Sequence, residues 1–207
     1  VTALYVKRTG DEKLLDENAR FISARQLEEE EQEAYLEPTV LRMSSSVYEH
    51  CCLAIDRSLT SGAHGLPLIG AGDWNDSMNH VGEKGRGESV WLGFFLYKIL
   101  TDFIPICEQR ADAERVKRYR SYKKKLKGHL NKEGWDGEWY RRAFYDDGTP
   151  LGSSESDECK IDAIAQSWSV ISKAAPHDKT VKALDSANLH LVSESEGIIR
   201  LLTPPFD

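Results

Sequence analysis

The segment Asp73-Trp74-Asn75-Asp76 places two carboxylates, an amide and an indole in four consecutive residues. It follows Gly65–Gly72, a stretch with three glycines and a proline, in which the backbone can turn sharply and approach a ligand closely. A tryptophan offers a flat apolar face to a sugar ring. Carboxylates and amides bind hydroxyl groups, and carboxylates also move protons. These residue types at this spacing indicate a site that processes carbohydrate.

The same residues allow two other interpretations. In a calcium loop of the EF-hand type, Asp73, Asn75 and Ser77 would occupy the first three ligand positions. The pattern then fails, because Met78 stands where glycine is required and Lys84 where the bidentate glutamate is required. The alternative that Asp73 and Asp76 only cap turns stays open.

Cleavage of a glycosidic bond needs an acid that protonates the leaving oxygen and a nucleophile that attacks the anomeric carbon. An inverting hydrolase uses a second carboxylate to activate water, and Glu88 is the nearby candidate. A phosphorylase needs only one acid, because phosphate is itself an anionic nucleophile. Glu88 could also complement the dipole of the helix that follows it, or bind a sugar hydroxyl.

Three further clusters have both a structural and a functional interpretation. The alternating glycines of Gly82–Ser89 resemble a phosphate cradle but match neither common nucleotide-binding pattern. Trp135–Arg142, which includes Trp139, is either a sugar platform beside an anion site or a core strand whose arginines extend to solvent. Gln166 lies off the apolar face of its predicted helix and could reach a cleft, whereas Trp168 is expected in the core.

The overall composition is that of an ordinary globular domain, with 207 residues, 40% hydrophobic and 29% charged. A net charge of −7 argues against a nucleic-acid partner. No apolar run approaches the roughly 20 residues of a membrane helix, and the N-terminus has no signal-peptide pattern. The four cysteines match neither a zinc pattern nor a dense disulfide framework, so buried free thiols are expected and no metal site is predicted.

Apolar spacing predicts a mainly helical chain. A triple serine, Ser44–Ser46, should cap one of the helices, and Asp147-Gly148 should form a hairpin turn after a short strand at 138–145. Residues 60–87 should be a long functional loop, and 197–202 should be extended. The predicted helices cover residues 11–22, a segment after Ser46, a buried helix after Ser89, and residues 111–130, 161–174 and 179–191.

Very apolar helices alternate along the chain with charged ones. This pattern favours a layered helical toroid, with a buried inner ring, a solvated outer ring and loops that form a cleft at one end. The fold class predicted is therefore all-α.

Several motifs follow one another in order along the chain: Gly72–Asp76 with Met78-Asn79, Gly87–Leu92, Trp135–Ala143, Asp147–Ser153, and Ile161-Asp162 with Ala165–Trp168. Together they resemble glycoside hydrolase family 94, which contains cellobiose, chitobiose and 1,2-β-oligoglucan phosphorylases and the C-terminal region of cyclic β-1,2-glucan synthases. The residues of these motifs are most similar to the synthase and oligoglucan branch.

The resemblance implies a segment of an (α/α)6 barrel with a short β-hairpin insertion, and inverting phosphorolysis of a β-glucoside that releases α-glucose 1-phosphate. It assigns the general acid to Asp76, a sugar-contacting aromatic to Trp74 and a hydroxyl acceptor to Asp73. With these we predict a substrate-binding set of Asp73, Trp74, Asn75, Glu88, Trp139 and Gln166. Inorganic phosphate is the expected co-substrate, with no cofactor, and the partner is a β-glucan or β-linked oligosaccharide.

The chain departs from the family pattern in two ways. Ser77 stands where close relatives usually have glycine. The family's phosphate-binding histidine motif, its N-terminal β-sandwich and its first barrel helices have no counterpart here. We therefore expect residues 1–207 to be a single barrel segment that is incomplete at both ends. For the full-length protein we expect a homodimer in the cytoplasm, or the cytosolic part of a larger membrane protein.

Two rival functions remain. An inverting hydrolase on the same fold would release free sugar without phosphate. A non-catalytic carbohydrate-binding segment would keep Trp74 and Trp139 but would not need Asp76.

Overall fold

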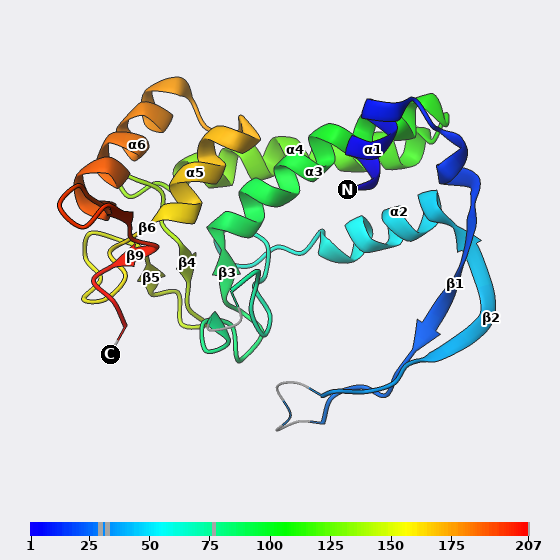
Figure 1. The fold of residues 1–207 in the computed structure, drawn as a ribbon, viewed down its shortest axis with the longest axis horizontal. Helices are drawn as coiled ribbons and strands as arrows, with labels where there is room; N and C mark the ends of the chain where they lie inside the picture. Colours follow the sequence, from blue (N-terminus) through cyan, green and yellow to red (C-terminus); the bar gives the residue numbers. More distant parts are fainter. Residues whose placement is uncertain (29–30, 32–33, 76–77, 207) are drawn as a thin grey trace. The chain divides into compact units, whose positions relative to one another are not determined.

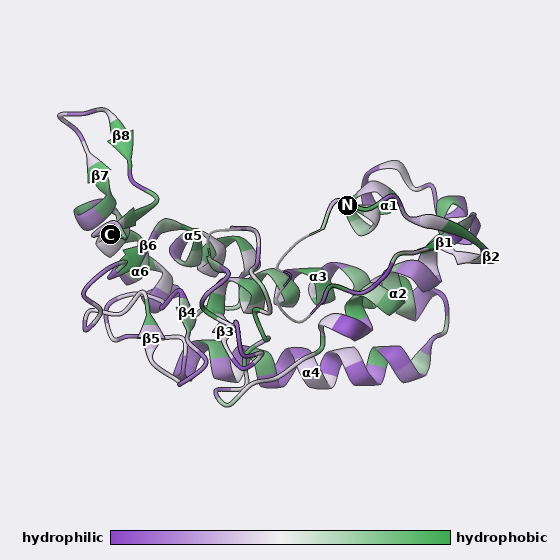
Figure 2. Ribbon diagram, turned by 90° about the horizontal axis from the view of Figure 1, so that it is seen from below, coloured by the Kyte–Doolittle hydropathy of each residue, from purple (hydrophilic) through white to green (hydrophobic). Residues whose placement is uncertain are grey.

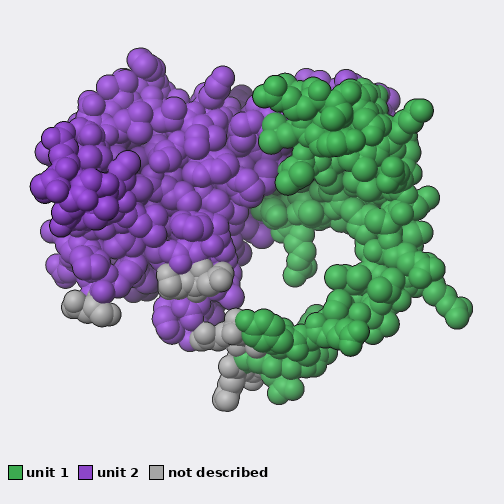
Figure 3. All heavy atoms as spheres, viewed as in Figure 1, with its two compact units in different colours: residues 1–59 green, residues 60–207 purple. Residues whose placement is uncertain are grey.

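The protein is described from a computed structural model that covers residues 1–28, 31, 34–75 and 78–206. The chain forms two compact units, Val1–Leu59 and Thr60–Asp207 (Figure 3). The prediction that both belong to one barrel segment stays a prediction.

The first unit contains a long antiparallel strand pair that the sequence pattern did not predict. Strands β1 (Asn18–Ser23) and β2 (Thr39–Ser46) align Asn18 with Ser46 and Ser23 with Thr39, with a register shift between Arg20 and Ile22. The helix predicted for residues 11–22 is therefore wrong, because hydrogen bonds to a partner strand replace helical ones there. The elements of this unit are α1 (Thr2–Thr9), the 3-10 helix η1 (Lys13–Asp16), β1 (Asn18–Ser23), β2 (Thr39–Ser46) and α2 (Val47–Ser58).

Helix α2 begins where the serine cluster predicted. The Ser46 hydroxyl accepts a hydrogen bond from the backbone N–H of Glu49, which satisfies one of the free donors at the helix N-terminus. Tyr48, Cys52 and Ile55 form the buried face of the helix. On the neighbouring face, a ring nitrogen of His50 lies 3.0 Å from the carbonyl oxygen of Ala19.

The second unit contains the candidate site. Its elements are β3 (Glu88–Ser89), α3 (Val90–Gln109), α4 (Ala113–Lys132), β4 (Ala143–Phe144), β5 (Pro150–Leu151), β6 (Ile161–Asp162), α5 (Ala163–Ser172), α6 (His177–Leu191), β7 (Val192–Ser193), β8 (Ile198–Ile199) and β9 (Leu202–Thr203). Figure 1 shows α3, α4 and α5 together in this unit, with the short strands β3, β4 and β5 beside the N-terminal end of α3.

Helix α3 is the core of this unit. It packs against α4 and α5, and half of its twenty residues are buried, among them Val90, Phe94 and Leu100. Figure 2 shows the contrast between hydrophobic α3 and largely hydrophilic α4, which buries only Tyr119, Leu126 and Leu130. This confirms the predicted pairing of a buried helix with a solvated one.

Contrary to the sequence expectation, α3 is long and apolar enough to cross a membrane by length and composition. The core helix of a soluble fold meets the same criterion, and the packing of α3 against α4 and α5 is of that kind.

A three-stranded sheet lies at the beginning of α3. Glu88 pairs with Phe144, and Ala143 with Leu151, so β3, β4 and β5 run antiparallel. The hairpin turn predicted at Asp147-Gly148 is confirmed, because it joins β4 to β5. The strand predicted for residues 138–145 is shorter than expected, since only Ala143 and Phe144 are in the sheet.

The long loop is also confirmed: between Leu59 and Glu88 the described residues form no α-helix and no strand beyond one isolated bridge from Leu68 to Glu88. At the other end of the unit, helix α5 begins at Ala163, later than the predicted Ile161. The reason is that Ile161 and Asp162 pair with β9, where Ile161 lies opposite Thr203. The helices and short strands are those of a helical domain, and a barrel segment stays a prediction.

Candidate active site

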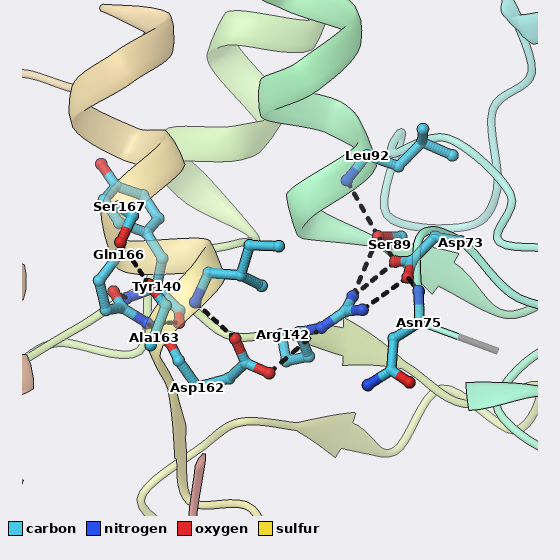
Figure 4. Close-up of polar contacts among 11 residues, drawn as sticks. Asp73, Asn75, Ser89, Leu92, Tyr140, Arg142, Asp162, Ala163, Gln166 and Ser167 are labelled. Carbon is cyan, nitrogen blue, oxygen red and sulfur yellow. Dashed lines mark hydrogen bonds and ion pairs between the residues drawn. The ribbon is translucent and has the colours of Figure 1, made fainter. Parts of the chain in front are cut away.

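A buried guanidinium organises the region around the Asp73–Asp76 motif. Arg142 Nη1 and Nη2 each lie 2.7 Å from one carboxylate oxygen of Asp73, which is the bidentate geometry of a strong ion pair. Both side chains are fully buried. On its other side, Arg142 Nε lies 3.4 Å from Asp162 Oδ2. Figure 4 shows the guanidinium between the two carboxylates.

This network reaches the first turns of two helices. The Ser89 hydroxyl donates to Asp73 Oδ2 at 2.8 Å and accepts from the backbone N–H of Leu92, so it caps α3. The Asp162 carboxylate accepts from the backbone N–H of Ile164 and caps α5 in the same way. Burial raises the pKa of Asp162, although Arg142 and the capping N–H groups act to lower it.

The Asp73 carboxylate also starts a turn of the chain. Asp73 Oδ1 accepts from the backbone N–H of Asn75 at 3.2 Å, an arrangement that local aspartate turns use. Between them, Trp74 leaves 47% of its surface exposed. Its ring lies edge-on to that of Trp91, with 6.4 Å between centroids. Asp76, the predicted acid, lies outside the described residues.

Glu88 lies on the opposite face of strand β3 from the Ser89 hydroxyl. Its carboxylate accepts from the backbone N–H groups of His64 and Leu66 and lies 2.6 Å from His64 Nδ1. The His64 ring stacks on Phe144 at 3.8 Å. Glu88 therefore secures the start of the long loop, beside a cavity of about 500 Å³ that His64, Arg86 and Asp147 also line. The N-terminal cap of α3 is supplied by Ser89, not by Glu88.

Trp139 and Gln166 lie in the interior. The indole nitrogen of Trp139 donates to the carbonyl oxygens of Gly152 and Lys160. The Gln166 amide accepts from the backbone N–H of Tyr140 and donates to its carbonyl oxygen, which joins α5 to the chain before β4. Gln166 is fully buried. The structure thus brings Asp73, Trp74 and Asn75 together but places Glu88, Trp139 and Gln166 in separate contacts. The roles of all six residues in substrate binding stay predictions.

The glycine-rich segment predicted as a weak phosphate cradle already holds an anion from the protein. The Asp146 carboxylate accepts from the backbone N–H groups of Lys84, Arg86 and Gly87 at 2.7–2.9 Å. Burial acts to raise the pKa of Asp146, but these N–H donors outweigh it and the pKa is lowered. The loop is therefore fastened to the β4–β5 hairpin.

Sequence reasoning missed the partners that fix these residues. Arg142 was expected either beside an anion site or on a core strand with its side chain extending to solvent, yet its side chain is fully buried. Its pairing with Asp73 spans 69 residues, so no local pattern reveals it. His64 and Asp146 were not identified either. The available signals were a histidine within a glycine-rich loop and an aspartate directly before a hairpin turn.

Comparison with known proteins gives a match over the whole chain. Residues 1–207 match the family described as the glycosyl hydrolase 94 superfamily, catalytic domain.

Three relatives illustrate the range of that similarity. Cyclic beta-(1,2)-glucan synthase NdvB of Rhizobium meliloti (strain 1021) is 46% identical over 206 residues, which are 99% of this chain and 7% of that protein. The 3-O-beta-D-glucopyranosyl-beta-D-glucuronide phosphorylase of Paenibacillus borealis is 38% identical over 79% of this chain and 21% of its own length. Cellobionic acid phosphorylase of Neurospora crassa is 32% identical over 98% of this chain and 23% of its own. The chain spans less than a quarter of each of these relatives.

Proposed function

Because the chain belongs to the glycosyl hydrolase 94 superfamily, we propose that it is a catalytic-domain segment of an inverting β-glucoside phosphorylase or cyclic β-1,2-glucan synthase. The observation that carries the proposal is 46% identity to a cyclic β-1,2-glucan synthase over 99% of the chain. The phosphorylases among its relatives support the same kind of chemistry. The proposed substrate is a β-glucan, and the proposed product is α-glucose 1-phosphate.

In the proposed reaction Asp76 gives its proton to the glycosidic oxygen while a phosphate oxygen attacks the anomeric carbon from the opposite face. The bond between the anomeric carbon and the leaving oxygen breaks with inversion. The proton of Asp76 ends on the released sugar hydroxyl. Trp74, which is partly exposed next to the buried anchor Asp73, is suited to stacking against a sugar ring. The reaction needs phosphate as co-substrate and no cofactor.

The hydrolase alternative needs a second carboxylate that activates water, about 6.5–9.5 Å from the acid. Glu88 was the nearby candidate. It is poorly suited to that role, because its oxygens already accept from His64 and Leu66 in the protein interior. This argues against Glu88 as the general base of a hydrolase.

The experiment uses the full-length protein with β-1,2-glucan and inorganic phosphate. Wild-type protein should release glucose 1-phosphate, and Asp76→Asn should lower that release by at least about 10²-fold, since an amide cannot donate the proton. Asp185→Asn removes an exposed carboxylate on α6 and is the matched control. Undiminished release by Asp76→Asn would sink the acid assignment, and free glucose formed without phosphate would support the hydrolase.

Titration with β-1,2-glucan separates an enzyme from a module that only binds sugar. If wild-type protein and Asp76→Ala bind glucan equally and neither forms a product, the segment is a binding module and the proposal is wrong.

A further inference from the structure

We propose that Arg142 is a positioning residue: through Asp73, and without touching substrate, it fixes the turn that carries Trp74 and leads to Asp76. The inference rests on the proposed function for its activity readout. It also changes the role expected of Asp73, from a hydroxyl acceptor for the sugar to the anchor of the turn.

The first support is that the Asp73 carboxylate is already occupied. Oδ1 accepts from Arg142 Nη2 and the Asn75 N–H, and Oδ2 accepts from Arg142 Nη1 and the Ser89 hydroxyl. Four hydrogen bonds use about all the lone pairs that a carboxylate offers. Its side chain is also fully buried. A sugar hydroxyl could bind Asp73 only by displacing one of these partners.

The second support is that the Arg142 backbone is itself held on both sides. Its N–H donates to the Leu151 carbonyl oxygen at 2.8 Å, and its own carbonyl oxygen accepts from the N–H of Val90 at 3.1 Å. Gly152 passes so close that an added Cβ would lie 2.4 Å from the Arg142 nitrogen. The guanidinium therefore projects from a rigid base between β5 and the start of α3.

The third support is the set of elements that meet at this one guanidinium. Arg142 contacts Ser89, the cap of α3, and Asp162, the cap of α5, as well as Asp73 (Figure 4). A charged side chain is almost never fully buried unless it is paired. Here the pairing joins the Asp73 turn, which lies in an irregular segment, to both helix caps. The turn that carries Trp74 is thereby held to the starts of α3 and α5.

The direct test is fluorine NMR of the 207-residue chain labelled with 5-fluorotryptophan. Its five tryptophans give separate probes, and the Trp74 signal is identified by its loss in Trp74→Phe. Arg142→Lys keeps the charge but cannot form the bidentate pair. Arg142→Lys and Asp73→Asn should both shift or broaden the Trp74 signal while the Trp135 and Trp139 signals stay in place. A Trp74 signal unchanged in both variants would overturn the proposal.

Arg141→Lys is the matched control. Its guanidinium donates to the carbonyl oxygens of Glu133 and Trp135 and pairs with Asp136, away from the Asp73 turn. It should leave the Trp74 signal unmoved. Should Arg142→Lys fail to fold, shown by collapse of all five signals, Asp73→Asn alone decides the test.

The activity test is a double-mutant cycle in the full-length protein with β-1,2-glucan and phosphate. Arg142→Lys should lower kcat about 10- to 100-fold with KM roughly unchanged, as a misplaced catalytic turn predicts. Because Arg142 acts through Asp73, the double variant with Asp73→Asn should be no slower than the slower single variant. If the fold-losses in kcat of the two single variants multiply in the double variant, the proposal is overturned. If wild-type protein forms no glucose 1-phosphate, the proposed function fails, and the NMR result still decides the role of Arg142.

Discussion

Glu88 is a buried carboxylate whose hydrogen bonds all go to the loop that it faces. Two backbone N–H groups and the His64 imidazole share its two oxygens. In Glu88→Gln one oxygen becomes an NH₂ group, so the backbone N–H of His64 keeps one acceptor oxygen instead of two. The buried hydrogen bonds from His64 and Leu66 also lose the negative charge that strengthens them. We expect the free energy of unfolding to fall by about 1–3 kcal/mol.

Urea denaturation checks this prediction, with Glu194→Gln as an exposed control that should leave the midpoint unchanged. Equal midpoints for Glu88→Gln and wild type would show that the carboxylate is not needed to hold the loop.

Asp162 predicts a pH dependence of the opposite sign to that of most carboxylates. Burial raises its pKa in the folded protein above the unfolded value of about 3.9. Between the unfolded and the folded pKa, the Asp162 carboxyl of the folded state therefore binds more protons than that of the unfolded state. The Asp162 contribution to stability falls as pH rises through the folded pKa. Asp162→Asn removes this dependence and still caps α5, since asparagine is a good N-cap.

The measurement is the difference in unfolding free energy between wild type and Asp162→Asn, followed upward from about pH 4. The difference should move against wild type as pH rises. A difference that is constant or moves the other way would contradict the raised pKa.

At the scale of elements, the β4–β5 hairpin depends on a close approach of two backbone segments. Gly152 and Gly148 both have positive φ, 79° and 89°, so alanine at either position costs about 1–2 kcal/mol in backbone strain. Only at Gly152 would the new Cβ also meet the Arg142 backbone, at 2.4 Å; at Gly148 the nearest atom is 3.9 Å away. Gly152→Ala should therefore destabilise the protein clearly more than Gly148→Ala.

Thermal unfolding of the two alanine variants measures the difference, because the shared φ penalty cancels. Similar melting temperatures would mean that the hairpin yields without strain and that Arg142 is less firmly held than its hydrogen bonds imply.

The same scale shows what the sequence could and could not predict about the fold. Helix α3 and the cap of α2 follow from local signals, namely a run of apolar residues and a serine cluster, and both are present. Strand β1 was taken for a helix because its pairing partner, β2, is separated from it by 15 residues in the sequence and leaves no trace in local spacing. Helix periodicity is counted within one segment, whereas strand pairing depends on two.

The candidate site divides in the same way. Residues 73–75 are brought together because they are neighbours in the sequence. Arg142 and Asp162 complete the network only through the fold, since they come from β-strand regions distant in the chain. The chemistry of a motif can thus be predicted from its residue types, whereas the charged residues that hold the motif in place can be identified only from the structure.

At the scale of the whole molecule, the division into Val1–Leu59 and Thr60–Asp207 has a consequence for stability. All five tryptophans lie in the second unit, as do the four network residues Asp73, Ser89, Arg142 and Asp162. The buried clusters around Ile69 and Trp139 are also formed entirely within it. Tryptophan fluorescence therefore reports on the second unit alone.

We expect residues 60–207, produced without the first unit, to unfold in urea with the same fluorescence midpoint and slope as the whole chain. The physical reason is that α3 buries its apolar face on α4 and α5 of the same unit, so the hydrophobic stabilisation is retained. The slope matters because it scales with the surface exposed on unfolding. A lower midpoint at equal slope would mean that the first unit stabilises the second. A lower slope would mean that residues 60–207 alone no longer form the full core. The support of the Asp73 turn would then be lost as well.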